Sequence, residues 1–137
     1  MLVREAMGGP VDSCSADTTI TQVAKKMADE DHGAMPVIQN GLLIGIITER
    51  DVLKSVGLGK NPELTLVQEL MTPDPDYLEP EVSVQDAADW MLAAGYRHLP
   101  VVEDGDVLGI LSVKDVLWAL TGGIEGAGAW SRNGSTD

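Results

Sequence analysis

Apolar residues in the first half of the chain recur at helical spacing and then gather in two short runs. Residues 20–28 carry apolar side chains at the spacing of an amphipathic helix. Thr19, followed three positions later by Gln22, is a capping-box signature. We therefore expect a helix over residues 21–31, preceded by a short β-prone stretch at residues 18–20.

The two apolar runs that follow this helix predict a β-hairpin. They span residues 34–39 and 42–48, and the dipeptide Asn40-Gly41 between them is typical of a tight turn. Helical spacing then returns over residues 49–56. The first half of the chain is thus expected to fold in the order β-α-β-β-α.

The second half repeats this pattern at a fixed offset. The residues that recur do so 64 positions later, as Pro36 is matched by Pro100 and Asp51 by Asp115. The elements expected in the second copy are a helix beginning after Ser83, strands over residues 99–103 and 107–112, and a helix over residues 113–120. Because an internal repeat sets the architecture, we predict an α/β (α+β) fold of two β-α-β-β-α repeats related by a pseudo-two-fold axis.

The segments between and around the repeats give the expected boundaries. Short helical lead-ins precede the repeats at residues 3–7 and 67–71, and the two prolines of residues 72–76 predict an extended loop. The expected division of the chain is repeat one at residues 1–58, a linker at 59–66, repeat two at 67–121 and a flexible Gly-rich tail at 122–137.

Charge and composition exclude several classes of function. The net charge of −13 argues against nucleic-acid partners and against an anionic membrane surface. The single cysteine, Cys14, allows no intramolecular disulfide, and pairing it with His32 or His98 as a zinc site has no support from ligand spacing. No leader segment or membrane-spanning run is recognisable, so a cytoplasmic location is expected. No catalytic triad, P-loop or dinucleotide fingerprint is present either, so we expect no enzymatic activity.

Each repeat ends in a hydroxyl residue followed three positions later by an aspartate. These pairs are Thr48 with Asp51 and Ser112 with Asp115. A hydroxyl at a helix start and a carboxylate one turn later share a face, and a carboxylate accepts hydrogen bonds from the two vicinal hydroxyls of a ribose. The same pairs also fit a simple capping arrangement that stabilises a helix by about 1 kcal/mol. The sequence leaves both interpretations open.

Taken together, these motifs resemble a known family. The element order, the apolar-Pro-Val strand, the Asn/Asp-Gly turn and the Gly-apolar-apolar-Ser/Thr-x-x-Asp ending are similar to a cystathionine β-synthase (CBS) domain, and two in tandem resemble a Bateman module. The resemblance covers Val3 to Leu120. It implies a stand-alone regulatory protein that senses an adenosine-containing ligand of the AMP, ADP, ATP, NAD or S-adenosylmethionine class.

The resemblance also implies roles for particular residues. The aspartates would bind ribose with Thr48 and Ser112 beside them, and basic residues at positions 97 and 98 would contact a phosphate. Arg97 and His98 fill these positions in repeat two, whereas Gly33 and Ala34 fill them in repeat one. The Asp115 cleft is therefore expected to suit a phosphorylated nucleotide. The Asp51 cleft is expected to take a nucleoside-like group, to bind weakly or to stay empty.

In the family each cleft borrows its base pocket from the other repeat. For the Asp115 cleft this implies Thr18, Val23 and Ala34, with Ile110 on its own side. For the Asp51 cleft it implies Val82, Ala87 and His98, with Ile46. Plain core packing is the alternative for the apolar members of both sets.

The resulting hypothesis is a sensor that binds an adenine nucleotide between its repeats and changes a protein–protein surface. No cofactor is required beyond this regulatory ligand. We expect a homodimer formed through the faces that carry Val52 with Leu53 and Val116 with Leu117, and an effector protein that the sequence does not name. The alternative is a constitutive scaffold or dimerisation module whose repeats bind no ligand.

Overall fold

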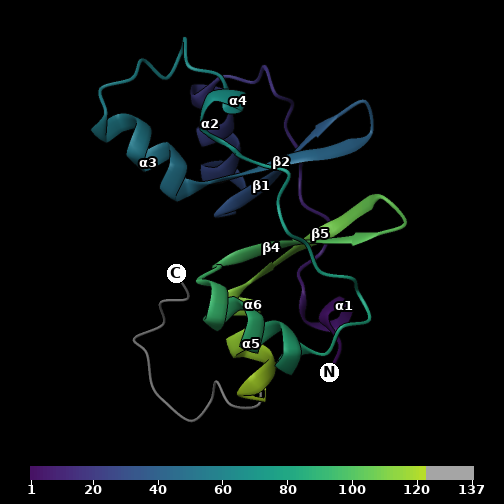
Figure 1. Ribbon diagram of the computed structural model, residues 1–137. Coiled ribbons are helices and arrows are strands. Elements are labelled where there is room, and N and C mark those ends of the chain that lie inside the picture. Colours follow the sequence, from purple (N-terminus) through teal and green to yellow (C-terminus); the bar gives the residue numbers. More distant parts are fainter. Residues whose placement is uncertain (123–137) are drawn as a thin grey trace.

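The computed structural model describes residues 1–122 of the 137-residue chain (Figure 1). Its elements are α1 (Val3–Ala6), α2 (Ile20–Glu30), β1 (Ala34–Gln39), β2 (Leu42–Thr48), α3 (Glu49–Gly57), α4 (Val67–Leu70), β3 (Thr72–Pro73), α5 (Val84–Ala94), β4 (His98–Glu103), β5 (Asp106–Ser112) and α6 (Val113–Leu120). The predicted mixed fold and its principal helices and hairpins are confirmed, with boundaries within one or two residues. The predicted tail, apart from Gly122, lies outside the described residues.

Local chemistry accounts for where the long helices begin and end. In α2 the Thr19 hydroxyl accepts a hydrogen bond from the Gln22 backbone N–H, and the Gln22 side chain accepts one from the Thr19 N–H. The chain leaves α2 at Asp31 with φ of 54° and leaves the equivalent helix α5 at Gly95 with φ of 78°. A left-handed residue at the helix end turns the chain sharply toward the following strand.

The two hairpins have the turns that their sequences predict. Asn40 and Gly41 have φ values of 52° and 78°, and Asp104 and Gly105 have values of 51° and 85°. Two successive positive φ values are typical of the type I′ turn, whose twist matches that of the strands. Ala34 pairs with Thr48 at the open end of the first hairpin, and His98 pairs with Ser112 at the same place in the second. The strand register therefore places the hydroxyl residue of each hydroxyl–aspartate pair, Thr48 or Ser112, beside the first residue of the hairpin.

The prediction of an opening strand in each repeat is wrong. Around residues 18–20 the structure has only an isolated bridge from Thr19 to Leu66, and at the equivalent place in repeat two an isolated bridge joins Ser83 to Leu2. The predicted loop at residues 72–76 instead begins with β3, which pairs with β2. Proline has no N–H to donate to a neighbouring strand. Pro73 is tolerated because β3 lies at the edge of the sheet.

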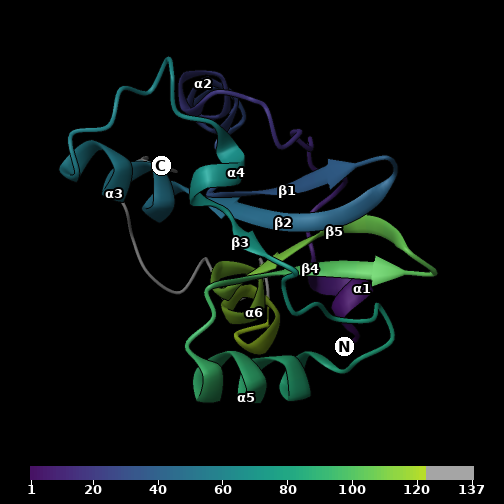
Figure 2. The same ribbon diagram turned by 45° about the horizontal axis from the view of Figure 1, so that its top comes forward.

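The two lead-in helices pack on the repeats that they do not precede. Val3 and Ala6 of α1 lie in the core of repeat two, and the Val3 N–H donates to the Val82 carbonyl at 2.8 Å. Val67 of α4 lies in the core of repeat one, and its N–H donates to the Thr18 carbonyl at 2.8 Å. Figure 2 shows α1 beside α5 and the second hairpin, and α4 beside the first. The lead-ins therefore tie the two repeats together.

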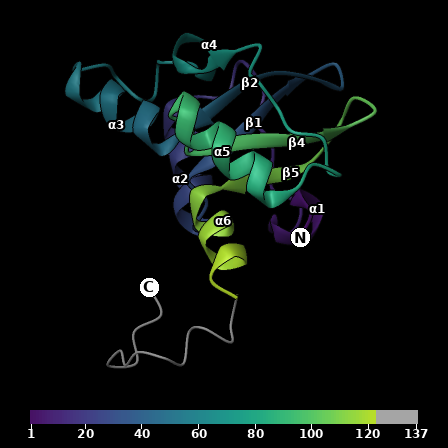
Figure 3. The same cartoon turned by 60° about the horizontal axis from the view of Figure 1, so that its bottom comes forward.

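The hairpins lie side by side in all views and form the centre of the molecule (Figure 3). Each repeat has its own buried core, built of Val, Ile, Leu, Ala, Met and the thiol of Cys14. A small third cluster of Ala34, Ile46 and Ile110 joins them. The repeats thus share an apolar junction. In the part of the chain that the structure describes, no helix is long and apolar enough to cross a membrane.

Candidate functional site

Two cavities open where the repeats meet. The larger, which we call the first cleft, has a volume of about 930 Å³ and contains Asp115. The smaller, the second cleft, has a volume of about 330 Å³ and contains Thr48. Both are lined by residues of both repeats, so a molecule bound in either one would contact both halves of the fold.

The Ser112–Asp115 pair stands at the N-terminus of α6 in the first cleft. The Ser112 N–H donates to Asp115 Oδ2 at 2.8 Å, and the Asp115 N–H donates to Ser112 Oγ at 3.1 Å. The pair is therefore a capping box. Within residues 1–122 no hydrogen bond reaches Asp115 Oδ1, so this oxygen retains its capacity to accept hydrogen bonds from a ligand.

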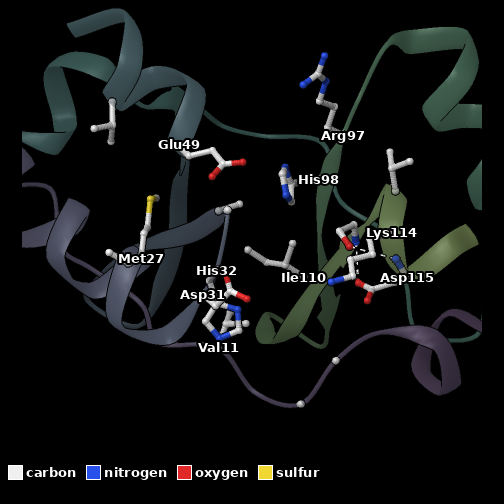
Figure 4. Close-up of a pocket in the computed structure, with 18 of the residues that line it drawn as sticks. Val11, Met27, Asp31, His32, Glu49, Arg97, His98, Ile110, Lys114 and Asp115 are labelled. Atoms are coloured by element: carbon white, nitrogen blue, oxygen red, sulfur yellow. Dashed lines mark hydrogen bonds between the residues drawn. The ribbon is translucent and has the colours of Figure 1, made fainter. Parts of the chain in front are cut away.

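Other polar and charged side chains line the rest of the first cleft. Figure 4 shows Lys114 beside Asp115, Arg97 and His98 at the start of β4, and Glu49, Asp31 and His32 on the repeat-one side. Ala34 and Ile110 supply an apolar floor between the two sides. The first cleft thus combines a free carboxylate oxygen, an apolar surface and two cationic side chains, Arg97 and Lys114.

His98 is half-buried in the middle of this arrangement. Burial lowers its pKa, and Arg97 acts in the same direction, whereas Glu49 and Asp115 oppose the shift. A Cβ placed on Gly33 would lie 3.2 Å from both His98 Nε2 and Glu49 Oε1. Because Gly33 has no side chain, there is room beside it for both the His98 ring and the Glu49 carboxylate.

The second cleft presents a different set of groups. Thr48, Arg50, Asp76 and Tyr96 line it, together with Arg97 and His98. The Tyr96 hydroxyl donates to the Asp76 carboxylate, and this hydrogen bond, with minor help from desolvation, raises the pKa of Tyr96. Tyr96 also meets Trp90 edge to face, with ring centroids 5.7 Å apart. These contacts fix an aromatic side chain at the edge of the cleft.

Asp51 forms the same capping box as Asp115 but lines neither cavity. Its Oδ2 accepts from the Thr48 N–H at 2.9 Å and from the Thr48 hydroxyl at 3.0 Å. In the described residues the equivalent hydroxyl-to-carboxylate bond does not form between Ser112 and Asp115. The carboxylate of Asp51 is thus engaged more fully by its own helix.

The structure brings together most, but not all, of the residues that the sequence pointed to. The first cleft contains Ala34, Arg97, His98, Ile110, Ser112 and Asp115. The second contains Ile46, Thr48, Arg97 and His98.

The remaining residues lie elsewhere. Val23 and Ala87 are fully buried in the two cores, so core packing accounts for them. Thr18 accepts from the Ser15 N–H in a turn, and Val82 packs against the repeat-two core.

The expected difference between the clefts takes another form in the structure. The sequence predicted Arg97 for the Asp115 cleft alone and His98 for both clefts, but in the structure Arg97 also lines both cavities, and Arg50 lines the second. Glu49, which borders both clefts, was missed because its counterpart in repeat two is the apolar Val113 and the repeat comparison gives no signal there. The charged residues Glu49 and Arg97 therefore border both clefts, and neither residue belongs to one cleft alone.

Cys14 offers no metal chemistry here. Its thiol is buried, with Sγ 3.7 Å from the Pro36 carbonyl, and burial raises its pKa to about 11. Among residues 1–122 no group of three or more His, Cys, Asp or Glu side chains is arranged to hold a metal ion.

Comparisons with known proteins agree with the geometry. A family model for the CBS domain matches residues 3–57 and again residues 67–122. The chain is 31% identical over 115 residues to the CBS domain-containing protein YhcV of Bacillus subtilis, an alignment that covers 83% of this chain and 81% of YhcV. The matched regions cover between 42% and 81% of the length of five curated relatives.

Two solved structures have the same fold. The CBS domain protein NE2398 superposes with a TM-score of 0.82 at 31% identity, covering 88% of this chain and 97% of that one. The CBS domain pair of MJ0100, solved in complex with 5′-methylthioadenosine and S-adenosyl-L-methionine, superposes with a TM-score of 0.82 at 25% identity, covering 89% of this chain and 97% of that one.

Proposed function

The chain belongs to the CBS domain family, and we propose that it is a regulatory module that binds a phosphorylated adenosine-containing ligand in the first cleft. The observation that carries this proposal is the free Oδ1 of Asp115, which lies in a large cavity together with Arg97, His98 and Lys114. The ligands named for the MJ0100 structure contain adenosine, which supports the adenosine part of this proposal; the phosphate part rests on the cationic side chains of the cleft.

Each part of such a ligand has a matching group in the cleft. Asp115 Oδ1 accepts hydrogen bonds from the two ribose hydroxyls. Ala34 and Ile110 offer apolar contact to a base. Arg97 holds a phosphate through paired N–H donors, and the N-terminus of α6 adds a favourable dipole.

Binding would act on the packing of the two repeats. The first cleft is lined by α2 and β1 of repeat one and by β4, β5 and α6 of repeat two. A ligand that contacts both sides favours the arrangement in which both sets of contacts form. This change of arrangement is the signal that a partner protein would read.

A homodimer remains part of the proposal, through a smaller surface than the sequence suggested. Leu53 and Leu117 are 70% and 57% exposed and remain available. Val116 is buried within its own chain and Val52 packs against the repeat-one core, so these two are not available to a partner. The effector protein, the cytoplasmic location, and the absence of enzymatic activity and of a required cofactor stay predictions from the sequence.

Calorimetric titration of the full chain with AMP, ADP, ATP, NAD and S-adenosylmethionine tests the ligand proposal. We expect saturable binding of at least one of them, and Asp115→Ala should weaken it at least about tenfold because a charge-assisted hydrogen-bond acceptor is lost. The matched control is Asp51→Ala, which removes the equivalent capping box but lines neither cleft.

Comparison of the two variants separates a ligand role from a capping role. Both should lose about 1 kcal/mol of unfolding free energy, since each loses a helix cap. If both weaken binding equally, Asp115 acts only through helix stability. If none of the five compounds binds to the intact chain, the scaffold alternative is correct.

A further inference from the structure

The two clefts have three lining residues in common. Glu49, Arg97 and His98 border both cavities. Glu49 comes from the start of α3 in repeat one, and His98 from the start of β4 in repeat two. Figure 4 shows the Glu49 carboxylate directed toward the His98 ring across the junction. We call these three residues the shared wall.

Backbone contacts hold the shared wall in place. The Glu49 N–H donates to the Gly33 carbonyl at 2.9 Å, and the Val113 N–H donates to the Arg97 carbonyl at 3.0 Å. His98 Nε2 and Glu49 Oε1 both lie close to Gly33, at 3.2 Å from the position that a Cβ would take. Side chains of both repeats therefore approach each other beside Gly33.

The shared wall also holds one permanently charged cation, Arg97, that borders both clefts. Lys114 lines only the first cleft and Arg50 only the second, whereas Arg97 lines both. An anion in the first cleft therefore has Lys114 and Arg97 as permanently charged donors, and an anion in the second has Arg50 and Arg97. Glu49 places a negative charge beside both clefts, which makes this cation more important to each of them.

We propose that the two clefts are negatively coupled, so that an anionic ligand held by the shared wall in one cleft weakens the binding of a second anion in the other. The inference rests on the proposed function, since it requires that the clefts bind phosphorylated ligands. A guanidinium grips one phosphate in a bidentate manner, and its charge is then compensated. A second phosphate on the far side of the wall meets the charge of the first across a partly dry junction.

Site-resolved titration of the full ¹⁵N-labelled chain tests this coupling. The backbone amide of Ser112 reports on the first cleft and that of Thr48 on the second, with AMP as the anionic probe and adenosine as its neutral control. In Asp115→Ala, with the first cleft impaired, half-saturation of the Thr48 signal should need less AMP than in the intact chain. A decrease of about 5- to 150-fold is the range that coupled sites show.

Two controls identify the shared cation as the cause. With adenosine, Asp115→Ala should leave the Thr48 half-saturation unchanged, because a neutral ligand does not compete for a cation. In an Arg97→Ala background, Asp115→Ala should produce no gain with AMP. Arg97 is exposed, so this substitution removes the charge without opening the core.

The outcomes that contradict the coupling differ from those that contradict ligand binding. Equal half-saturation of the Thr48 signal in the intact chain and in Asp115→Ala would show that the clefts are independent. An equal gain with adenosine, or a gain that persists without Arg97, would show coupling by another route and overturn the role of the shared wall. If neither reporter in the intact chain responds to any of the five compounds of the calorimetric titration, the proposed function itself fails.

Discussion

At the scale of residues, the same local motif has different surroundings in the two repeats. Thr48 with Asp51 and Ser112 with Asp115 are both capping boxes, yet only Asp115 faces a cavity. The sequence correctly predicted the hydroxyl, the carboxylate and the helix start, because these depend on neighbours within one turn. Which carboxylate faces open space depends on residues from the other repeat.

His98 provides a pH-dependent prediction at this scale. Burial lowers its pKa below the ordinary value of 6.5, so below that pH the unfolded chain binds more protons than the folded one. The free energy of unfolding should therefore fall as the pH decreases through this region. His98→Gln does not titrate here, so wild type should lose stability relative to this variant between about pH 8 and about pH 5.5. Urea denaturation at several pH values measures the difference, and a constant difference would contradict the assigned shift.

At the scale of elements, short-range signals predicted helices and hairpins well but missed the edge strand. Helix caps and tight turns depend on residues close together in the chain, so the sequence predicts them. Examples are the caps at Thr19 and Ser83 and the turns at residues 40–41 and 104–105. β3 forms because residues 72–73 run antiparallel beside β2, with Pro73 paired with Gly45. A pairing between distant segments leaves no periodic pattern in a two-residue strand.

The pairing of β3 with β2 leaves less room for a side chain at Gly45 than at its repeat-two counterpart, Gly109. A Cβ on Gly45 would overlap the Met71 side chain and lie 3.1 Å from the Thr72 carbonyl oxygen, whereas a Cβ on Gly109 meets nothing closer than 3.5 Å. We expect Gly45→Ala to lower the unfolding free energy by about 1–3 kcal/mol through overpacking. Gly109→Ala should have a clearly smaller effect. Chemical denaturation of both variants measures the change. Equal decreases in unfolding free energy would show that Gly45 is not tightly packed against residues 71–72.

At the scale of the whole molecule, the exchanged lead-in helices join two repeats that would each have a small core. α1 completes the core of repeat two and α4 completes that of repeat one. Small units bury a low fraction of their surface, so each gains from apolar residues that the other end of the chain supplies. We infer that the repeats unfold together rather than separately.

Val3 and Val67 allow a matched test of this exchange, because they occupy equivalent positions and are both fully buried. Each substitution to alanine should lower the unfolding free energy by about 2 kcal/mol. In hydrogen exchange followed by mass spectrometry, Val3→Ala should reduce protection first in α5 and β4, and Val67→Ala first in α2 and β1. Loss of protection that begins in repeat one for Val3→Ala, or in repeat two for Val67→Ala, would contradict the packing described here.

The sequence by itself determined the duplication, the helices, the hairpins and the family to which the chain belongs. These features follow from periodicity, caps, turn residues and a fixed offset, all of which act over short stretches of chain. Only the tertiary structure decided that each lead-in packs on the other repeat, that Asp115 but not Asp51 faces a cavity, and that Glu49 and Arg97 border both clefts. These features depend on how two similar surfaces pack against each other, and the residues that meet there, such as Glu49 and His98, are far apart in the sequence and share no motif.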